Sequence, residues 1–164
     1  MKAFAGWAQR ASRSTTCTGP TPETPLEESL SAIKEYRDSG KIRHVGVSNV
    51  GTGQIERARQ VVPIAAVQNR YNLSERTYDD VVDYCAREGL VCLAYFPLHG
   101  DAHPALADIA EGHGATPAQI ALAWLLKRSP TMLPIPGTRS VEHVKENLAA
   151  LDIELSDTEF QALL

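Results

Sequence analysis

The feature that most constrains the fold is a regular alternation of short apolar runs with segments of helical spacing. The apolar runs end near residues 48, 68, 95 and 135, and each is followed by an amphipathic segment. Strands and helices that alternate with short connections are typical of a parallel sheet. The sequence therefore predicts an α/β fold with four parallel strands, ending at the four positions above.

Composition excludes several classes of function. The chain has 164 residues and a formal charge of −4, with acidic and basic residues interspersed, so we expect no nucleic-acid partner. No apolar run approaches the length of a membrane span and the N-terminus lacks the apolar core of a signal peptide, so we expect a cytoplasmic protein that does not bind membranes. The odd cysteine number and the lack of CxxC spacing argue against a disulfide framework or a metal site.

The chain divides into two parts by composition. Residues 1–19 are rich in Ala, Ser, Thr and Arg, contain no acidic residue and show no clear period, so we expect them to lie outside the fold. From Pro20 onward the helix signals are regular: Thr24, Thr116 and Ser156 are each predicted to cap a helix, with Glu27, Gln119 and Glu159 completing capping boxes. We therefore expect one structured segment, residues 20–164.

Polar and aromatic residues stand where the predicted strands end, which is the active edge of a barrel of parallel strands. The amide and hydroxyl groups at the first two strand ends suit a neutral carboxamide, and the aromatic ring at the third suits a flat ligand ring. Backbone N–H groups, a hydroxyl and a guanidinium at the fourth could bind a phosphate, with two polar residues beyond them near a purine. In chain order the candidates are Ser48, Asn49, Gln68, Tyr95, Pro97, Leu98, Gly137, Thr138, Arg139, Glu146 and Asn147. The plainer interpretation is that such groups only satisfy loop backbone.

Four motifs, in this order and spacing, resemble the C-terminal half of the aldo-keto reductases. They are GKIRHVGVSN, AAVQNRYN, LAYFPL and IPGTRSVEHVKENL, and the resemblance covers about residues 20–164. It implies a partial TIM (β/α)8 barrel, here four strands with their helices. It also implies reduction of aldehyde or ketone carbonyls with NADPH, and therefore a small-molecule carbonyl substrate.

The resemblance also implies roles for the strand-end residues. Ser48, Asn49 and Gln68 would hold the nicotinamide carboxamide, and Tyr95 would stack on the ring, with Pro97 and Leu98 following in the same loop. Gly137, Thr138 and Arg139 would bind the 2′-phosphate, and Glu146 and Asn147 would lie at the adenine. Phe96, His99 and His143 depart from the residues usual in the family. The preference for NADPH over NADH rests on Arg139 alone.

The family's catalytic Asp, Tyr, Lys and His all precede the matching segment, and the position of that His is occupied by Thr18. We therefore predict no catalytic residue in this chain and no activity of the chain alone. Half a barrel also leaves strand edges unpaired, which favours self-association. A non-enzymatic NADPH-binding or assembly module, or a truncated product without function, are the alternatives.

The first residues have a possible origin in the genetic code. The family strand YYLHRPDP, with suitable codons read one base later, becomes Thr-Thr-Cys-Thr-Gly-Pro-Thr, which is the sequence of residues 15–21. Our hypothesis is that the segment up to about residue 21 is an out-of-frame translation.

Overall fold

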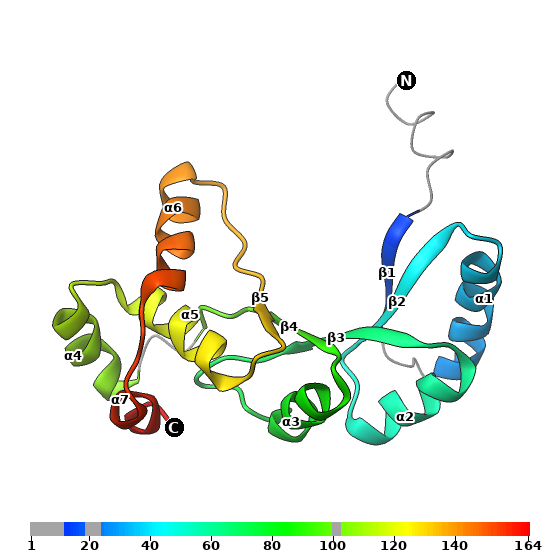
Figure 1. Cartoon of the computed structure of the whole chain (residues 1–164), viewed down its shortest axis with the longest axis horizontal. Coiled ribbons are helices and arrows are strands. Elements are labelled where there is room, and N and C mark those ends of the chain that lie inside the picture. The colour runs from blue at the N-terminus through cyan, green and yellow to red at the C-terminus, as the bar shows by residue number, and fades with distance from the viewer. Residues whose placement is uncertain (1–11, 19–23, 100–102) are drawn as a thin grey trace. The chain divides into compact units, whose positions relative to one another are not determined.

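The computed structural model describes residues 12–18, 24–99 and 103–164 (Figure 1). They belong to two compact units, one up to Gln68 and one from Asn69 to Leu164. In both units strands alternate with helices and the described strand pairs run parallel. The predicted α/β fold class is confirmed.

The first unit is a three-stranded parallel arrangement with two helices. In chain order its elements are β1 (Ser12–Thr18), α1 (Leu26–Asp38), β2 (Ile42–Ser48), α2 (Thr52–Val61) and β3 (Ile64–Arg70), of which the last two residues belong to the second unit. β2 pairs with both β1 and β3. Leu30, Val47, Ile55 and Val67 are fully buried, so the apolar sides of both helices face the strands.

Gly46 lies at a close approach of neighbouring strands. A Cβ atom built there would lie 3.1 Å from the carbonyl oxygen of Ala66 and 3.3 Å from Oγ1 of Thr16. A backbone carbonyl of a paired strand has little freedom to move away, so the small residue within the Val-Gly-Val run is required by packing.

The structure has one strand more than the sequence analysis predicted. β1 falls inside the segment that we expected to lie outside the fold, and it pairs with β2 from Ser12 opposite Ile42 to Thr18 opposite Ser48. Strand pairing uses backbone N–H and C=O groups, which every residue except proline supplies, so a Ser- and Thr-rich segment can join the sheet. Cys17 is buried here, and burial raises the pKa of its thiol. Residues 1–11 and 19 lie outside the described residues, and the out-of-frame origin stays a hypothesis.

The second unit packs helices on a parallel strand pair. After the end of β3 it contains α3 (Asp79–Glu88), β4 (Val91–Tyr95), α4 (Pro104–His113), α5 (Pro117–Arg128), β5 (Met132–Pro134), α6 (Val141–Ala149), the 3-10 turn η1 (Ala150–Asp152) and α7 (Asp157–Ala162). β4 pairs with β5 so that Cys92 lies opposite Met132 and Leu93 opposite Leu133. Helix α5 has the longest buried run of these helices, because every residue from Ile120 to Leu125 is buried.

Helix starts test the capping predictions. Thr116 and Ser156 accept hydrogen bonds from the backbone N–H groups of Gln119 and Glu159, as predicted. The prediction for Thr24 is wrong: α1 begins one residue later, with Pro25 at the N-cap position and no side-chain cap. Proline fits this boundary because its fixed φ suits the start of a helix and it has no N–H to satisfy.

The capping box of α7 makes stability dependent on pH. Oε2 of Glu159 accepts hydrogen bonds from the hydroxyl and the backbone N–H of Ser156, each at 2.7 Å, and its other oxygen lies 2.9 Å from Nε2 of His113. These bonds, those from Ser156 first, lower the pKa of Glu159 to about 2 from an ordinary value of 4.5. Because the folded pKa is the lower one, this stabilisation is complete above pH 4.5 and is lost as the pH falls through about 2.

We therefore expect Glu159→Gln to lower the melting temperature at pH 7, and the difference from the parent to shrink steadily below pH 4.5. Thermal melts followed by circular dichroism between pH 7 and pH 3 measure this difference. The control is Glu154→Gln, an exposed carboxylate in the preceding loop. A difference that does not depend on pH would contradict the prediction.

Candidate cofactor site

The first group of site residues lies at the carboxyl end of β2 and beside it in β3, two residues before β3 ends at Arg70. Ser48 and Gln68 are the last partners in the register of these strands, so their Cα atoms are neighbours. Ser48 is buried and Gln68 half-buried. This pair places a hydroxyl and a side-chain amide at the same edge of the sheet, as the sequence predicted.

Asn49 turns the chain away from this edge. Its φ is +58°, in the left-handed region that asparagine tolerates better than most residues. Its backbone N–H donates to the carbonyl oxygen of Gln68 at 3.0 Å, and its side chain is exposed. The next residue, Val50, is fully buried and holds the turn against the core. The three carboxamide-binding candidates are thus together within the first unit.

Tyr95 ends β4 and begins the second group of candidates. Its ring is half-buried and meets the ring of Phe96 edge to face, with centroids 5.4 Å apart. Phe96 has a φ of +51°, so the chain turns sharply directly after the strand. Pro97 is buried and Leu98 half-buried, so the two apolar residues of this turn point largely inward.

Asn72 is a positioning residue that sequence analysis missed. It is fully buried, and its Nδ2 donates to the carbonyl oxygen of Phe96 at 3.0 Å, across 24 positions of the chain. Its Oδ1 accepts from the backbone N–H groups of Ser74 and Glu75 at 3.0 and 2.9 Å. The Asn-Leu-Ser-Glu sequence is an Asx-turn signal, but the contact with Phe96 could not be read from it.

Residues 137–139 lie in the loop between β5, which ends at Pro134, and α6, which begins at Val141. Oγ1 of Thr138 accepts from the backbone N–H of Ser140 at 3.1 Å and lies 3.2 Å from Nδ1 of His143. Ser140 in turn caps α6 by accepting from the N–H of His143 at 3.4 Å. The Thr138 hydroxyl is therefore already engaged in shaping the loop, whereas the Arg139 side chain is exposed and has no ion pair with a described residue.

Glu146 and Asn147 lie on α6, one turn beyond His143. Glu146 is exposed and Asn147 half-buried. The backbone carbonyl of Glu146 accepts from Nε2 of Gln119 at 3.1 Å, which ties α6 to the start of α5. Because β4 and β5 are parallel, Tyr95 and the loop before α6 follow the same edge of that strand pair. The second group of candidates is thus gathered within the second unit.

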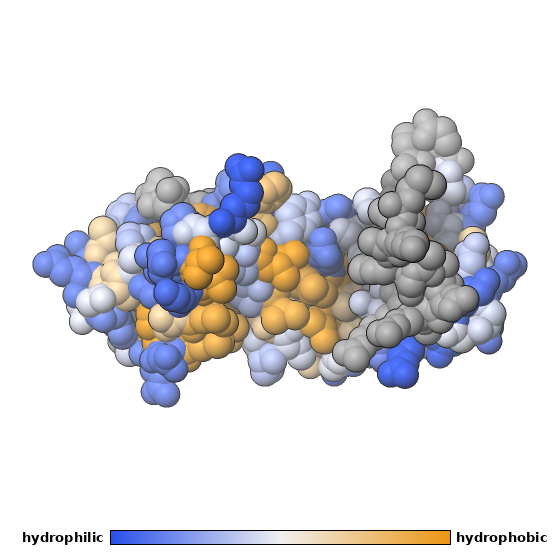
Figure 2. Space-filling view, turned by 90° about the horizontal axis from the view of Figure 1, so that it is seen from above, coloured by the Kyte–Doolittle hydropathy of each residue, from blue (hydrophilic) through white to orange (hydrophobic). Residues whose placement is uncertain are grey.

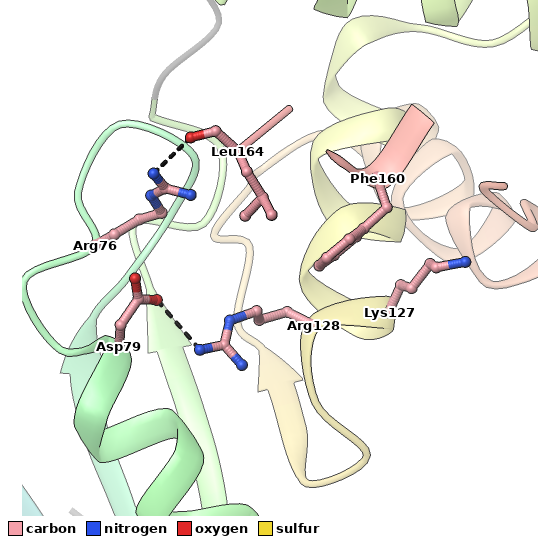
Figure 3. Close-up of a pocket in the computed structure, with 6 residues that line it drawn as sticks. All are labelled: Arg76, Asp79, Lys127, Arg128, Phe160 and Leu164. Carbon is pink, nitrogen blue, oxygen red and sulfur yellow. Dashed lines mark hydrogen bonds and ion pairs between the residues drawn. The ribbon is translucent and has the colours of Figure 1, made fainter. Parts of the chain in front are cut away.

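A separate pocket of about 500 Å³ in the second unit is lined by three basic side chains, Arg76, Lys127 and Arg128, with Asp79, Phe160 and Leu164 (Figure 3). Each cation already has a protein partner. Arg76 donates to the carbonyl oxygen of Leu164 at 2.6 Å, Lys127 lies 2.7 Å from Oδ1 of Asp157, and Arg128 lies 2.8 Å from Oδ1 of Asp83. The three basic side chains therefore hold neighbouring segments of the second unit together, and the pocket offers little positive charge to a ligand.

Arg128 also reaches Tyr71, a buried residue of the same unit. The Tyr71 hydroxyl donates to Asp79 and accepts from Nε of Arg128 at 3.2 Å. Burial, followed by the bond to Asp79, raises the pKa of Tyr71 well above its ordinary value. This phenol stays protonated and serves the packing of the second unit.

Among the described residues, no cluster of three or more His, Cys, Asp or Glu could hold a metal ion. No helix within the described ranges is both long and apolar enough to span a membrane.

The chain is similar to known proteins of one family. The model of the aldo/keto reductase family matches residues 16–103 and 100–163. Pyridoxine 4-dehydrogenase of Escherichia coli K12 is 44% identical over 142 residues, which are 85% of this chain and 49% of that protein. "Aldo-keto reductase yakc [NADP(+)]" of Schizosaccharomyces pombe is 31% identical over an alignment 173 residues long with its gaps. That alignment covers 82% of this chain and 51% of the other protein.

Solved structures show the same relation. A thermostable aldo-keto reductase crystallised with the inhibitor epalrestat superimposes with a TM-score of 0.87 at 37% identity, covering 95% of this chain and 60% of that one. An aldo-keto reductase of Klebsiella pneumoniae in complex with NADPH gives a TM-score of 0.83 at 30% identity, covering 95% and 58%. This chain belongs to the aldo/keto reductase family. It spans about half the length of the curated relatives described here, and its α/β fold corresponds to part of the family's barrel.

Proposed function

We propose that this chain is the cofactor-binding part of an NADPH-dependent oxidoreductase that reduces an aldehyde or ketone carbonyl. The observation that carries the proposal is the register pair of Ser48 and Gln68 beside the Asn49 turn, in a chain whose relatives include reductases crystallised with NADPH. Serine, asparagine and glutamine side chains together donate and accept hydrogen bonds without charge, which fits the two donors and one acceptor of a carboxamide.

In this proposal the strand-end residues would bind the nicotinamide of the cofactor. Ser48, Asn49 and Gln68 would hold its carboxamide, and the half-buried face of Tyr95 would stack on its ring. Pro97 and Leu98 would shape the wall beside it. Bound NADPH would supply the hydride that reduces the carbonyl carbon.

The phosphate-binding residues would be those of the loop before α6. Backbone N–H groups near Gly137 and the exposed guanidinium of Arg139 fit a 2′-phosphate, because both donate hydrogen bonds to phosphate oxygens. Neither group would require the loop to change its conformation. The Thr138 hydroxyl already contacts Ser140 and His143. It would therefore hold the loop in shape as well as donate a hydrogen bond to the phosphate. Glu146 and Asn147 would lie at the adenine.

The chain alone is not expected to turn over substrate. The family's Asp, Tyr, Lys and His lie outside the motifs matched here, and the position of that His carries Thr18, directly opposite Ser48 in the β1–β2 pair. A threonine hydroxyl does not ionise near neutral pH and so cannot replace an imidazole as general acid or base. The residues of this chain would therefore bind and orient the cofactor without protonating a product.

Titration of the purified chain with NADPH and with NADH tests the proposal. We expect saturable NADPH binding that Arg139→Ala weakens about 10-fold or more, since a charge-assisted hydrogen bond contributes roughly 1.5–3 kcal/mol. NADH binding should be unaffected by Arg139→Ala, because that ligand lacks the 2′-phosphate. Arg87→Ala, which removes an exposed cation from α3, is the control. Equal losses for both nucleotides would contradict the assigned role of Arg139, and no binding of either would contradict the proposed function.

A further inference from the structure

Helix α6 carries the two residues proposed to lie at the adenine, Glu146 and Asn147, but it has no buried side chain. All nine of its residues lie within the described ranges, and none of them is buried. Val141 is 69% and Leu148 59% exposed, and Figure 2 shows exposed hydrophobic residues on the part of the chain that contains this helix. A surface helix is normally held by an apolar face packed on a core. The position of α6 therefore depends on other contacts.

The two ends of α6 are held in different ways. At its start, Oγ1 of Thr138 lies 3.2 Å from Nδ1 of His143. At its end, Ala150 of η1 is buried, and the backbone carbonyl of Glu146 accepts a hydrogen bond from Nε2 of Gln119 at 3.1 Å. Glu146 is one of the last four residues of α6, whose carbonyl groups find no partner among the N–H groups of an α-helix. Gln119 therefore supplies a donor from outside the helix.

The side chain of Gln119 uses both ends of its amide. Its Oε1 accepts from the backbone N–H of Thr116 at 2.8 Å, which completes the capping box of α5, and its Nε2 donates to Glu146. These two bonds fix the orientation of the amide, because its oxygen can only accept and its NH2 group can only donate. Helix α5 is itself anchored by the buried run from Ile120 to Leu125, which begins at the next residue. Gln119 thus joins a buried helix to an exposed one.

We propose that Gln119 is a positioning residue for the adenosine part of NADPH. It holds the backbone at Glu146 and so fixes the place from which the side chains of Glu146 and Asn147 extend. The 2′-phosphate would be bound at the other end of α6, by the loop that precedes the helix. Gln119 should therefore strengthen nucleotide binding without setting the preference for the 2′-phosphate. This inference rests on the proposed function and adds to it a residue that acts through the backbone of α6.

Three substitutions separate the bond to α6 from the cap of α5. Gln119→Glu keeps an acceptor for Thr116, since glutamate also completes capping boxes, but it has no N–H to donate to Glu146. Gln119→Met removes both bonds without adding charge. Thr116→Ala removes the hydroxyl that accepts from the N–H of Gln119 at 3.2 Å and leaves the bond to Glu146 in place. Gln161→Glu, which adds the same charge at an exposed position of α7, is the control.

Titration of the full 164-residue chain with NADPH and with NADH measures the effect on binding. We expect Gln119→Glu and Gln119→Met to weaken both nucleotides about 3- to 10-fold, as is typical for the loss of one hydrogen bond. The ratio of the two affinities should stay the same, whereas Arg139→Ala should change it. Thr116→Ala should lower the melting temperature more than Gln119→Glu does and leave both affinities unchanged. Gln161→Glu should alter neither quantity.

Hydrogen exchange followed by mass spectrometry reports on α6 without any cofactor. In Gln119→Glu the amides of residues 144–149 should exchange at least about 3-fold faster than in the parent chain, because the helix end has lost a bond to α5. The amides of α5 should keep their protection, since its cap and its buried run are intact. A general loss of stability would raise exchange in both helices alike.

Faster exchange of α6 together with equal losses for NADPH and NADH would support the proposal. Unchanged exchange of α6 in Gln119→Glu would overturn it. So would a loss of affinity in Gln119→Glu that Gln119→Met does not share, since that loss would come from the added charge. Nucleotide binding that Gln119→Glu leaves unchanged would overturn the positioning role alone, whereas a parent chain that binds neither nucleotide would overturn the proposed function and this role with it.

Discussion

Replacing Trp124 by alanine is expected to lower the free energy of unfolding of the second unit by about 3–5 kcal/mol. The side chain is fully buried in α5 and lies between two other rings, Tyr71 with a centroid distance of 6.1 Å and Phe160 with one of 5.7 Å. Alanine would leave a cavity that these large neighbours can fill only in part. Urea denaturation followed by circular dichroism measures the loss.

Trp124→Phe is the informative companion. The indole Nε1 is buried and has no hydrogen-bond partner among the described residues, and an unpaired buried donor costs about 1–3 kcal/mol. Phenylalanine keeps an aromatic ring between Tyr71 and Phe160 and removes that donor. We therefore expect it to cost about 1 kcal/mol at most, since part of the lost packing is offset. A loss as large as that of the alanine variant would show that the indole N–H stabilises the fold.

Arg128→Ala is expected to have the second largest effect, a loss of about 2–3 kcal/mol. The guanidinium side chain is only 18% exposed and joins Asp83 at 2.8 Å, Asp79 at 3.4 Å and the buried hydroxyl of Tyr71. Its removal leaves that hydroxyl without one of its partners. The two carboxylates are about half exposed, so water can solvate them, which keeps the loss below that of a fully buried pair.

Two variants separate the charge from the packing of this side chain. Arg128→Met keeps the apolar stem and should recover part of the loss. Lys145→Ala breaks the ion pair with Glu142, in which both side chains are about 70% exposed. This change should alter the free energy of unfolding by no more than about 0.5 kcal/mol. If urea denaturation showed that Arg128→Ala lowers the free energy of unfolding no more than Lys145→Ala does, the contacts of Arg128 would not contribute to the stability of the fold.

Local patterns predicted much of this protein. Alternating apolar runs and helical segments were sufficient for the α/β class, because burial on one face imposes a period that can be read directly. Thr116 and Ser156 were recognised as helix caps, since a cap bonds a residue only three positions away. Ser48, Asn49 and Gln68 were placed at neighbouring strand ends for the same reason: parallel strands in chain order bring their carboxyl ends to one edge.

Other features depend on partners far apart in the chain. β1 was not predicted, because a Ser- and Thr-rich segment without period becomes a strand only when β2 supplies the backbone partners. Tyr36 has the spacing of the apolar stripe of α1, but it is 51% exposed, because the buried residues of this helix, Leu26 and Leu30, lie nearer its start.

The sequence by itself determined the periodicity of the elements, most of the helix starts and the polar strand ends, all of which follow from contacts within a few residues. Tertiary structure alone decided that Asn72 would bond the turn at Phe96 and that Arg128 would join Tyr71 across 57 positions. The tertiary structure also leaves the apolar side chains of Val141, Val144 and Leu148 on α6 exposed. The physical reason is that such contacts depend on which buried groups meet when distant segments pack, and a buried polar group bonds whatever partner that packing brings within reach.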